Sequence, residues 1–243
     1  MTRPDPQRIF SAIDATWPPA RHIHRHPWHL REGKGGGQRV SAATAVSSVI
    51  VTDIAEAETE MRAIGQVPLF MIRQGESDLD ALLEARGYQI VDPVTICLCA
   101  AHELAKDLAP ASAIPSWPPL AIQCELWSNA GIGPARIAVM DRVATPKIAL
   151  LGRSRDAPAG VCFVALDGDV AMLHALEVTP ETRKSGVATR ILNGAANWAL
   201  SKGAGWISVN VTSANAPANA LYRKLGMRPV AGYHYRRAPE ATT

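Results

Sequence analysis

A short stretch of small and basic residues, 183–188, constrains the fold of this chain more than any other feature. It follows an apolar, strand-like run at 172–178 and opens a long helical pattern, so the first-turn N–H groups of that helix have no intrahelical partner and converge on one point. The helix dipole favours an anion there, and Arg183 and Lys184 add positive charge. The stretch therefore predicts a strand–turn–helix unit that cradles a pyrophosphate.

A second motif follows the next strand-like run. Residues 206–211 alternate as a half-buried strand does, and 215–227 read Asn-Ala-Pro-Ala-Asn-Ala-Leu-Tyr-Arg-Lys-Leu-Gly-Met. Asn215 is suited to cap a helix, Pro217 falls in its first turn, and Gly226 is suited to end it. An ordinary N-cap turn is the alternative explanation of the first motif, and the second motif makes that alternative weaker.

The two motifs resemble those of the GNAT superfamily of N-acetyltransferases, in which Arg/Gln-x-x-Gly-x-Gly/Ala binds acetyl-CoA and Asn-x-x-Ala-x-x-Leu-Tyr-x-x-x-Gly-Phe follows. Met227 stands in place of the usual aromatic residue. The resemblance covers about residues 120–237 and implies an α/β (α+β) fold, with a mixed, mostly antiparallel sheet that is flanked by helices and splays to admit acetyl-CoA as cosubstrate. It implies cofactor contacts at Leu176, Val178, Arg183, Lys184, Ser185, Gly186, Val187, Ala188, Thr189 and Asn215.

The upstream half contains a segment that is similar in sequence pattern to one in the downstream half. Residues 81–88 match 220–227 in a helical pattern, a glycine stop and a following apolar residue, which predicts two GNAT-like halves. The N-terminal half is expected to be degenerate, because Leu83 stands where Tyr222 stands and 44–49 hold no glycine or basic residue to cradle phosphate. We expect a degenerate domain over 1–108, a Pro-rich linker over 109–119 and a catalytic domain over 120–243.

Local patterns upstream predict helices over 6–16, 52–64 and 77–86 and strands over 27–32, 38–47, 68–73 and 88–99. The dense histidines at 22–29 have no carboxylate or cysteine nearby, which favours a strand over a zinc site, and no metal is expected. Residues 34–37 lack Walker spacing and predict a hairpin loop. The strand at 233–237 is open to two interpretations: substrate contacts, or an edge strand that ends in solvated arginines.

The implied reaction requires an amine to attack a thioester at neutral pH. An alkylamine with a pKa near ~10.4 is almost all ammonium at pH 7, so the protein must accept a proton, stabilise an oxyanion and protonate the departing thiolate. The resemblance assigns these tasks to a side chain of the strand at 172–178, to the N–H of Leu176 and to the phenol of Tyr222. The alternative for Tyr222 is a helix tyrosine with a wet hydroxyl. Val178 is expected to pair its backbone with the pantetheine amide, and Asn215 to hold the pantetheine arm, cap its helix or do both.

Two residues compete for the role of base. Strict alternation gives the strand two faces, with Met172, His174, Leu176 and Val178 on one and Leu173, Ala175 and Glu177 on the other. The resemblance assigns the first face to the acceptor cleft, so His174 is the expected base and Glu177 is expected to point away and pair with a surface cation. For His174 the open alternative is a core histidine with both nitrogens satisfied.

The amino-acid composition excludes some classes of function but does not indicate a specific one. Of the 243 residues 47% are apolar and 19% charged, and a net charge of +3 is too small and dispersed to indicate nucleic-acid binding. No apolar signal or membrane-length run is present, so a cytoplasmic location is expected. The four cysteines lie in apolar runs and predict buried thiols, not disulfides.

Together these features predict an acetyl-CoA-dependent N-acetyltransferase. Its partners would be acetyl-CoA and a primary amine, with a small molecule favoured over a protein acceptor, and no nucleic acid or membrane. The chain is expected to be a monomer or homodimer. The alternative from another class is an acyl-CoA-binding sensor or scaffold without turnover, which would keep the same cofactor motif.

Overall fold

The structure is a computed structural model and describes residues 2–239. It divides into two compact units. The first holds the chain up to Pro18 together with Ile96–Val211 and Ala216–Val230, and the second holds Pro19–Thr95, Thr212–Asn215 and the chain from Ala231. These limits differ from the expected division at 108 and 119. The N-terminal helix packs in the first unit, and the expected linker contains a paired strand.

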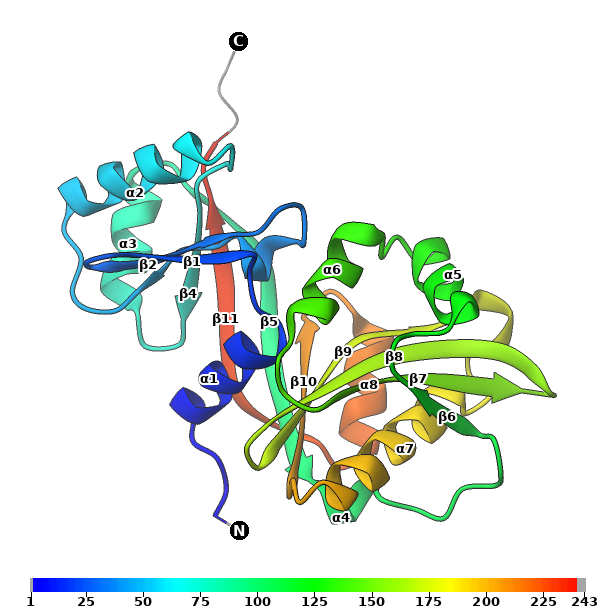
Figure 1. The fold of residues 1–243 in the computed structure, drawn as a ribbon. Helices are drawn as coiled ribbons and strands as arrows, with labels where there is room; N and C mark the ends of the chain where they lie inside the picture. The colour runs from blue at the N-terminus through cyan, green and yellow to red at the C-terminus, as the bar shows by residue number, and fades with distance from the viewer. Residues whose placement is uncertain (1, 240–243) are drawn as a thin grey trace. The chain divides into compact units, whose positions relative to one another are not determined.

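The first unit carries the first sequence motif and the second motif from Ala216 onward, and its helices and strands are labelled in Figure 1. Its elements are α1 (Pro6–Thr16), α4 (Ala101–Leu104), β6 (Ala113–Ser116), α5 (Ala121–Asn129), α6 (Pro134–Arg142), β7 (Lys147–Ser154), β8 (Ala157–Asp167), β9 (Val170–Val178), η2 (Pro180–Thr182), α7 (Val187–Ser201), β10 (Trp206–Thr212) and α8 (Ala216–Lys224). Strands β5 (Gln89–Ala100) and β11 (Arg228–Arg237) each pass from one unit to the other.

The sheet of the first unit is mixed and mostly antiparallel, as predicted. Its strand order is β10-β9-β8-β7-β6, and every pair in it is antiparallel except β10 with β9. The register of that parallel pair runs from Trp206↔Val170 to Val209↔Leu173, while β9 continues to Val178 and β10 to Thr212. The pairing of β9 and β10 thus ends before either strand does.

Helices cover both faces of this sheet (Figure 1). Helix α7 packs on β7, β8 and β9 over an apolar core, and α1 and α5 pack on β8 and β9. Gly160 of β8 permits the close approach of α7, because a Cβ there would lie 2.8 Å from the carbonyl oxygen of Glu177 and 3.0 Å from Val187. The start of α7 is therefore fixed against the end of β9.

The second unit pairs a small sheet with two helices. Its elements are β1 (Arg21–Arg25), β2 (Trp28–Glu32), η1 (Gln38–Val40), β3 (Thr44–Ala45), α2 (Val51–Ala63), β4 (Leu69–Arg73) and α3 (Ser77–Ala85). The helices are confirmed within one residue, but the strand predicted over 38–47 is wrong: that segment is a 3₁₀ turn followed by the two-residue β3. The histidines at 22–29 lie on the antiparallel β1–β2 hairpin, and 34–37 lie in the loop after it.

The similarity between residues 81–88 and 220–227 extends to local geometry. Helices α3 and α8 each end in a glycine with positive φ, Gly87 at 81° and Gly226 at 81°. In both, the N–H of the residue after the glycine donates to a carbonyl oxygen five residues earlier at a distance of 3.0 Å. The pairs are Tyr88 to Leu83 and Met227 to Tyr222. Both helices therefore end in the same hydrogen-bonded turn before a strand.

Two kinds of feature are absent from residues 2–239. None of the helices in this range is long and apolar enough to span a membrane. In the same range, groups of three or more His, Cys, Asp or Glu side chains arranged for a metal ion are absent. The cysteines are free thiols; Cys97, Cys99 and Cys162 are buried, whereas Cys124 is half-buried.

Candidate active site

The cradle between β9 and α7 is a pre-shaped loop. Gly186 at the N-cap of α7 has a φ of 82°, which glycine adopts without strain, and Lys184 has a φ of 62°. The hydroxyl of Thr182 donates to the carbonyl oxygen of Ala159 at 3.2 Å. The hydroxyl of Ser185 donates to the carbonyl oxygen of Thr182 at 2.5 Å. These contacts fix the loop. The N–H groups in the first turn of α7 have no acceptor within the helix.

The charges around the cradle favour an anion. The side chains of Arg183 and Lys184 are exposed, and Arg183 Nε donates to the carbonyl oxygen of Val178 at 3.4 Å. Arg190, one turn into α7, donates to the carbonyl oxygens of Ser185 at 3.1 Å and Arg153 at 3.0 Å. The loop thus combines a helix N-terminus with two accessible cations, which is a suitable site for a phosphate group.

Strand β9 contains a bulge that overturns the predicted alternation. Val161 of β8 pairs with Glu177 and Phe163 pairs with His174, so two residues of β9 lie opposite one of β8. Ala175 takes up the extra length with a φ of 51°. The indole N–H of Trp127 in α5 donates to the carbonyl oxygen of Ala175 at 2.8 Å.

After the bulge, each residue of β9 lies on the opposite face from the one that regular alternation predicts. Leu173 lies in the core under α7, and Leu176 and Val178 pack against that same core, so they do not share a face with His174. Glu177, between them, lies on the face of His174. The prediction that Glu177 points away from the face of His174 is wrong, because alternation breaks at Ala175.

His174 is enclosed in a packed pocket. Its side chain is 5% exposed, Trp17 stacks on the ring at 4.8 Å between centroids, and Phe163 lies at 6.2 Å. Its Nε2 lies 3.0 Å from the hydroxyl oxygen of Thr16. These contacts agree with the core alternative that the sequence left open for this histidine.

Glu177 is half-buried and sits among cations. Burial raises the pKa of its carboxyl group, and the charges of Arg183 in the cradle and Arg136 in α6 oppose that rise. Partial desolvation makes a carboxylate a stronger proton acceptor. Arg136 was not identified from the sequence, because a single arginine on a short helix carries no pattern that ties it to β9.

Tyr222 of α8 is buried in the core beside β9 and is 7% exposed, so a wet hydroxyl does not describe it. Burial raises the pKa of its phenol, and Cys162, Cys97 and Glu177 raise it further. The phenol therefore stays protonated at neutral pH. Asn215 directly precedes α8, in the connection Thr212–Asn215 that belongs to the second unit, and its N–H donates to the carbonyl oxygen of Thr212 at 3.0 Å.

Comparison with known proteins places these features in a family. The model of the acetyltransferase (GNAT) family matches residues 123–227. A curated protein, mycothiol acetyltransferase from Clavibacter michiganensis subsp. michiganensis (strain NCPPB 382), is 35% identical over 104 residues. That match covers 40% of this chain and 34% of the relative, so the chain matches about a third of the relative's length.

Solved structures share the fold over most of the chain. A GCN5-related N-acetyltransferase from Kribbella flavida superposes with a TM-score of 0.71 at 18% identity, covering 96% of this chain and 95% of that one. A tandem GNAT protein from the clavulanic acid biosynthesis pathway superposes with a TM-score of 0.63 at 15% identity, covering 89% and 78%. Residues 123–227, which hold the cradle, the bulged strand and Tyr222, are the part of this chain that matches the acetyltransferase (GNAT) family.

Proposed function

We propose that this protein is an N-acetyltransferase that moves an acetyl group from acetyl-CoA to a primary amine by direct attack within a ternary complex. The observation that carries the proposal is the arrangement of one bulged strand between a phosphate cradle and a buried tyrosine. Glu177 of β9 is three residues from the start of the turn that leads to α7, and its charge acts on the phenol of Tyr222. We therefore place a proton acceptor, a proton donor and an anion site at the end of β9.

The cradle fits the cosubstrate. The N–H groups at the start of α7 and the side chains around them, Arg183, Lys184, Ser185, Gly186, Val187, Ala188 and Thr189, would hold the pyrophosphate. The end of β9, beyond its pairing with β10, leaves Leu176 and Val178 to contact the pantetheine arm as an added strand would. We assign Asn215 to the same arm. Acetyl-CoA supplies the activated acetyl group, and the backbone N–H of Leu176 would stabilise the oxyanion.

We assign the role of base to Glu177. It lies on the face of β9 that also carries His174, it is half-buried, and burial raises its pKa, which makes its carboxylate a stronger base. His174 has one nitrogen engaged by Thr16 and its ring covered by Trp17. These contacts support a role for His174 in holding β9 and not in direct proton transfer.

We assign the role of general acid to Tyr222. A buried phenol with a raised pKa keeps its proton at neutral pH and can give it to a thiolate as negative charge develops on sulfur. The acceptor is proposed to be a small molecule; similarity to a protein named mycothiol acetyltransferase supports that choice. The second unit is proposed to be a degenerate copy, because Leu83 occupies the position that matches Tyr222.

Turnover tests the function against its alternative. Thiol release from acetyl-CoA should be amine-dependent for at least one member of a panel of small primary amines, and an acetylated amine should appear in equal amount. Calorimetric binding of acetyl-CoA without thiol release for any amine, N-terminal peptide or lysine peptide would instead favour a sensor or scaffold.

The cradle predicts the effect of Gly186→Glu. The carboxylate would repel the pyrophosphate and strain a backbone with a φ of 82°, so acetyl-CoA binding should be lost in calorimetry, where the wild type should saturate at one per chain. Gly203→Glu is the matched control, since Gly203 has a φ of 84° and its Cβ would meet no atom within 4 Å. Equal loss in both variants, or two equivalent sites in the wild type, would contradict the assignment.

The base assignment predicts the effects of Glu177→Gln and Arg136→Gln. The glutamine variant should lose about 10²-fold or more in kcat/KM, together with the acidic limb of its pH profile. Removing Arg136 removes a charge that lowers the pKa of Glu177, so the acidic limb should move to higher pH. Glu125→Gln, on the exposed side of α5, is the control. An active Glu177→Gln with an inactive His174→Ala would return the role to His174.

The general-acid assignment predicts that Tyr222→Phe lowers kcat far more than it weakens acetyl-CoA binding, because the hydroxyl acts only as the thiolate leaves. A loss of about 10²-fold in kcat is expected for a positioned proton donor. Tyr88→Phe removes the hydroxyl of a buried tyrosine in the second unit and controls for lost stability. Wild-type turnover in Tyr222→Phe would remove Tyr222 from the mechanism.

A further inference from the structure

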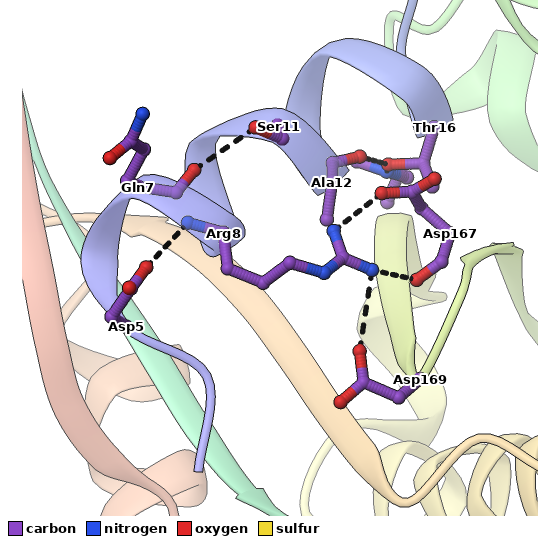
Figure 2. A network of polar contacts seen from close by, with 9 residues as sticks. Asp5, Gln7, Arg8, Ser11, Ala12, Thr16, Asp167 and Asp169 are labelled. Atoms are coloured by element: carbon purple, nitrogen blue, oxygen red, sulfur yellow. Dashed lines mark hydrogen bonds and ion pairs between the residues drawn. The ribbon is translucent and has the colours of Figure 1, made fainter. Parts of the chain in front are cut away.

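Helix α1 lies outside the segment that the family model matches, yet it contacts the β8–β9 hairpin at its start and strand β9 at its end. At its start, the guanidinium of Arg8 reaches the hairpin between β8 and β9, where it donates to the carboxylate and the carbonyl oxygen of Asp167 and to the carboxylate of Asp169 at 3.3 Å (Figure 2). Asp5 caps the helix by accepting from the N–H of Arg8 at 2.7 Å.

At the other end of α1, the hydroxyl of Thr16 determines which nitrogen of His174 carries a proton. The hydroxyl donates its single proton to the carbonyl oxygen of Ala12 at 2.6 Å (Figure 2). Its oxygen is therefore an acceptor toward His174 Nε2 at 3.0 Å, and Nε2 must be the donor. Thr16 is fully buried, so water does not offer His174 a substitute acceptor on this side.

His174 directly precedes the residue on which the bulge depends. Ala175 has a φ of 51°, and its carbonyl oxygen accepts from the indole of Trp127 at 2.8 Å. The strand is thus held on one side of the bulge by α1, through Thr16 and the stacked Trp17, and at the bulge itself by α5. Only the two residues of the bulge, Ala175 and Leu176, separate His174 from Glu177.

We propose that Thr16 is a positioning residue for acetyl transfer: it holds His174 as the Nε2–H tautomer and so fixes the β9 bulge that orients the N–H of Leu176 and the carboxylate of Glu177. The proposal rests on the proposed function, and it extends the catalytic unit to the N-terminal helix. Thr16 acts through His174 and touches no reacting atom.

The test compares three substitutions in α1. Thr16→Val keeps the shape and removes the acceptor, Thr16→Ser keeps the hydroxyl, and Ser11→Ala removes a comparable back-bond, from the Ser11 hydroxyl to the carbonyl oxygen of Gln7, on the exposed side of the same helix (Figure 2). The valine variant should lose about tenfold or more in kcat, a loss typical of misplacement on the scale of an ångström, with acetyl-CoA affinity unchanged by calorimetry. The serine variant should restore kcat, and Ser11→Ala should match the wild type.

A direct readout accompanies the kinetics. In ¹⁵N-labelled protein at neutral pH, the His174 resonances of the wild type and of Thr16→Ser should show a protonated Nε2, and Thr16→Val should shift the tautomer ratio toward Nδ1–H. If the valine variant does not fold, Thr16→Ala is measured in the same way. An unchanged tautomer, or unchanged kcat in a folded variant without the hydroxyl, overturns the proposal. The NMR result separates this from a failure of the proposed function, which would leave the tautomer dependent on Thr16 in a protein without turnover.

Discussion

The site depends on the β-bulge in β9, where two residues lie opposite one residue of β8. Without the bulge at Ala175, a regular strand would carry His174, Leu176 and Val178 on one face, and Glu177 would lie under α7, where a carboxylate would face an apolar core. The added residue turns Leu176 and Val178 to the core and Glu177 to the opposite face. A left-handed alanine costs about 1–2 kcal/mol, and the hydrogen bond from Trp127 offsets part of that cost.

The position of the cradle follows from that strand by close packing. The start of α7 can approach the end of β9 only because Gly160 carries no side chain; a Cβ there would clash with the carbonyl oxygen of Glu177 and with Val187. The same backbone segment therefore supports the carboxylate and the anion site. Burial acts in the same direction on two groups near this segment: it raises the pKa of Glu177 and the pKa of Tyr222, while the charge of Arg183 limits the rise at Glu177.

The sequence alone predicts the local units well, because helix caps, glycine stops and alternation act over a few residues. The strand–turn–helix unit of β9 and α7 and the helix α8 with its glycine stop are predicted on such signals and are found, and the mixed sheet agrees with what the family resemblance implies. The face of Glu177 was not predicted, since a bulge is a property of two strands and Ala175 has none of the glycine or asparagine character that marks a left-handed residue. The contacts of Thr16 and Trp127 with β9 span 158 and 48 residues, beyond any local pattern.

The repeated turn after α3 and α8 separates what folding requires from what chemistry requires. Both helices end on a glycine with the same φ and the same backbone hydrogen bond, so this turn needs only a glycine and a buried anchor at the position of Leu83 or Tyr222. Leucine and tyrosine both serve as that anchor, because each buries an apolar side chain. Only the tyrosine adds a proton donor, and burial of its hydroxyl carries a desolvation cost that a leucine does not have. A phenol in the core of the first unit and a leucine at the matching place in the second therefore fit one active copy and one structural copy of the same turn.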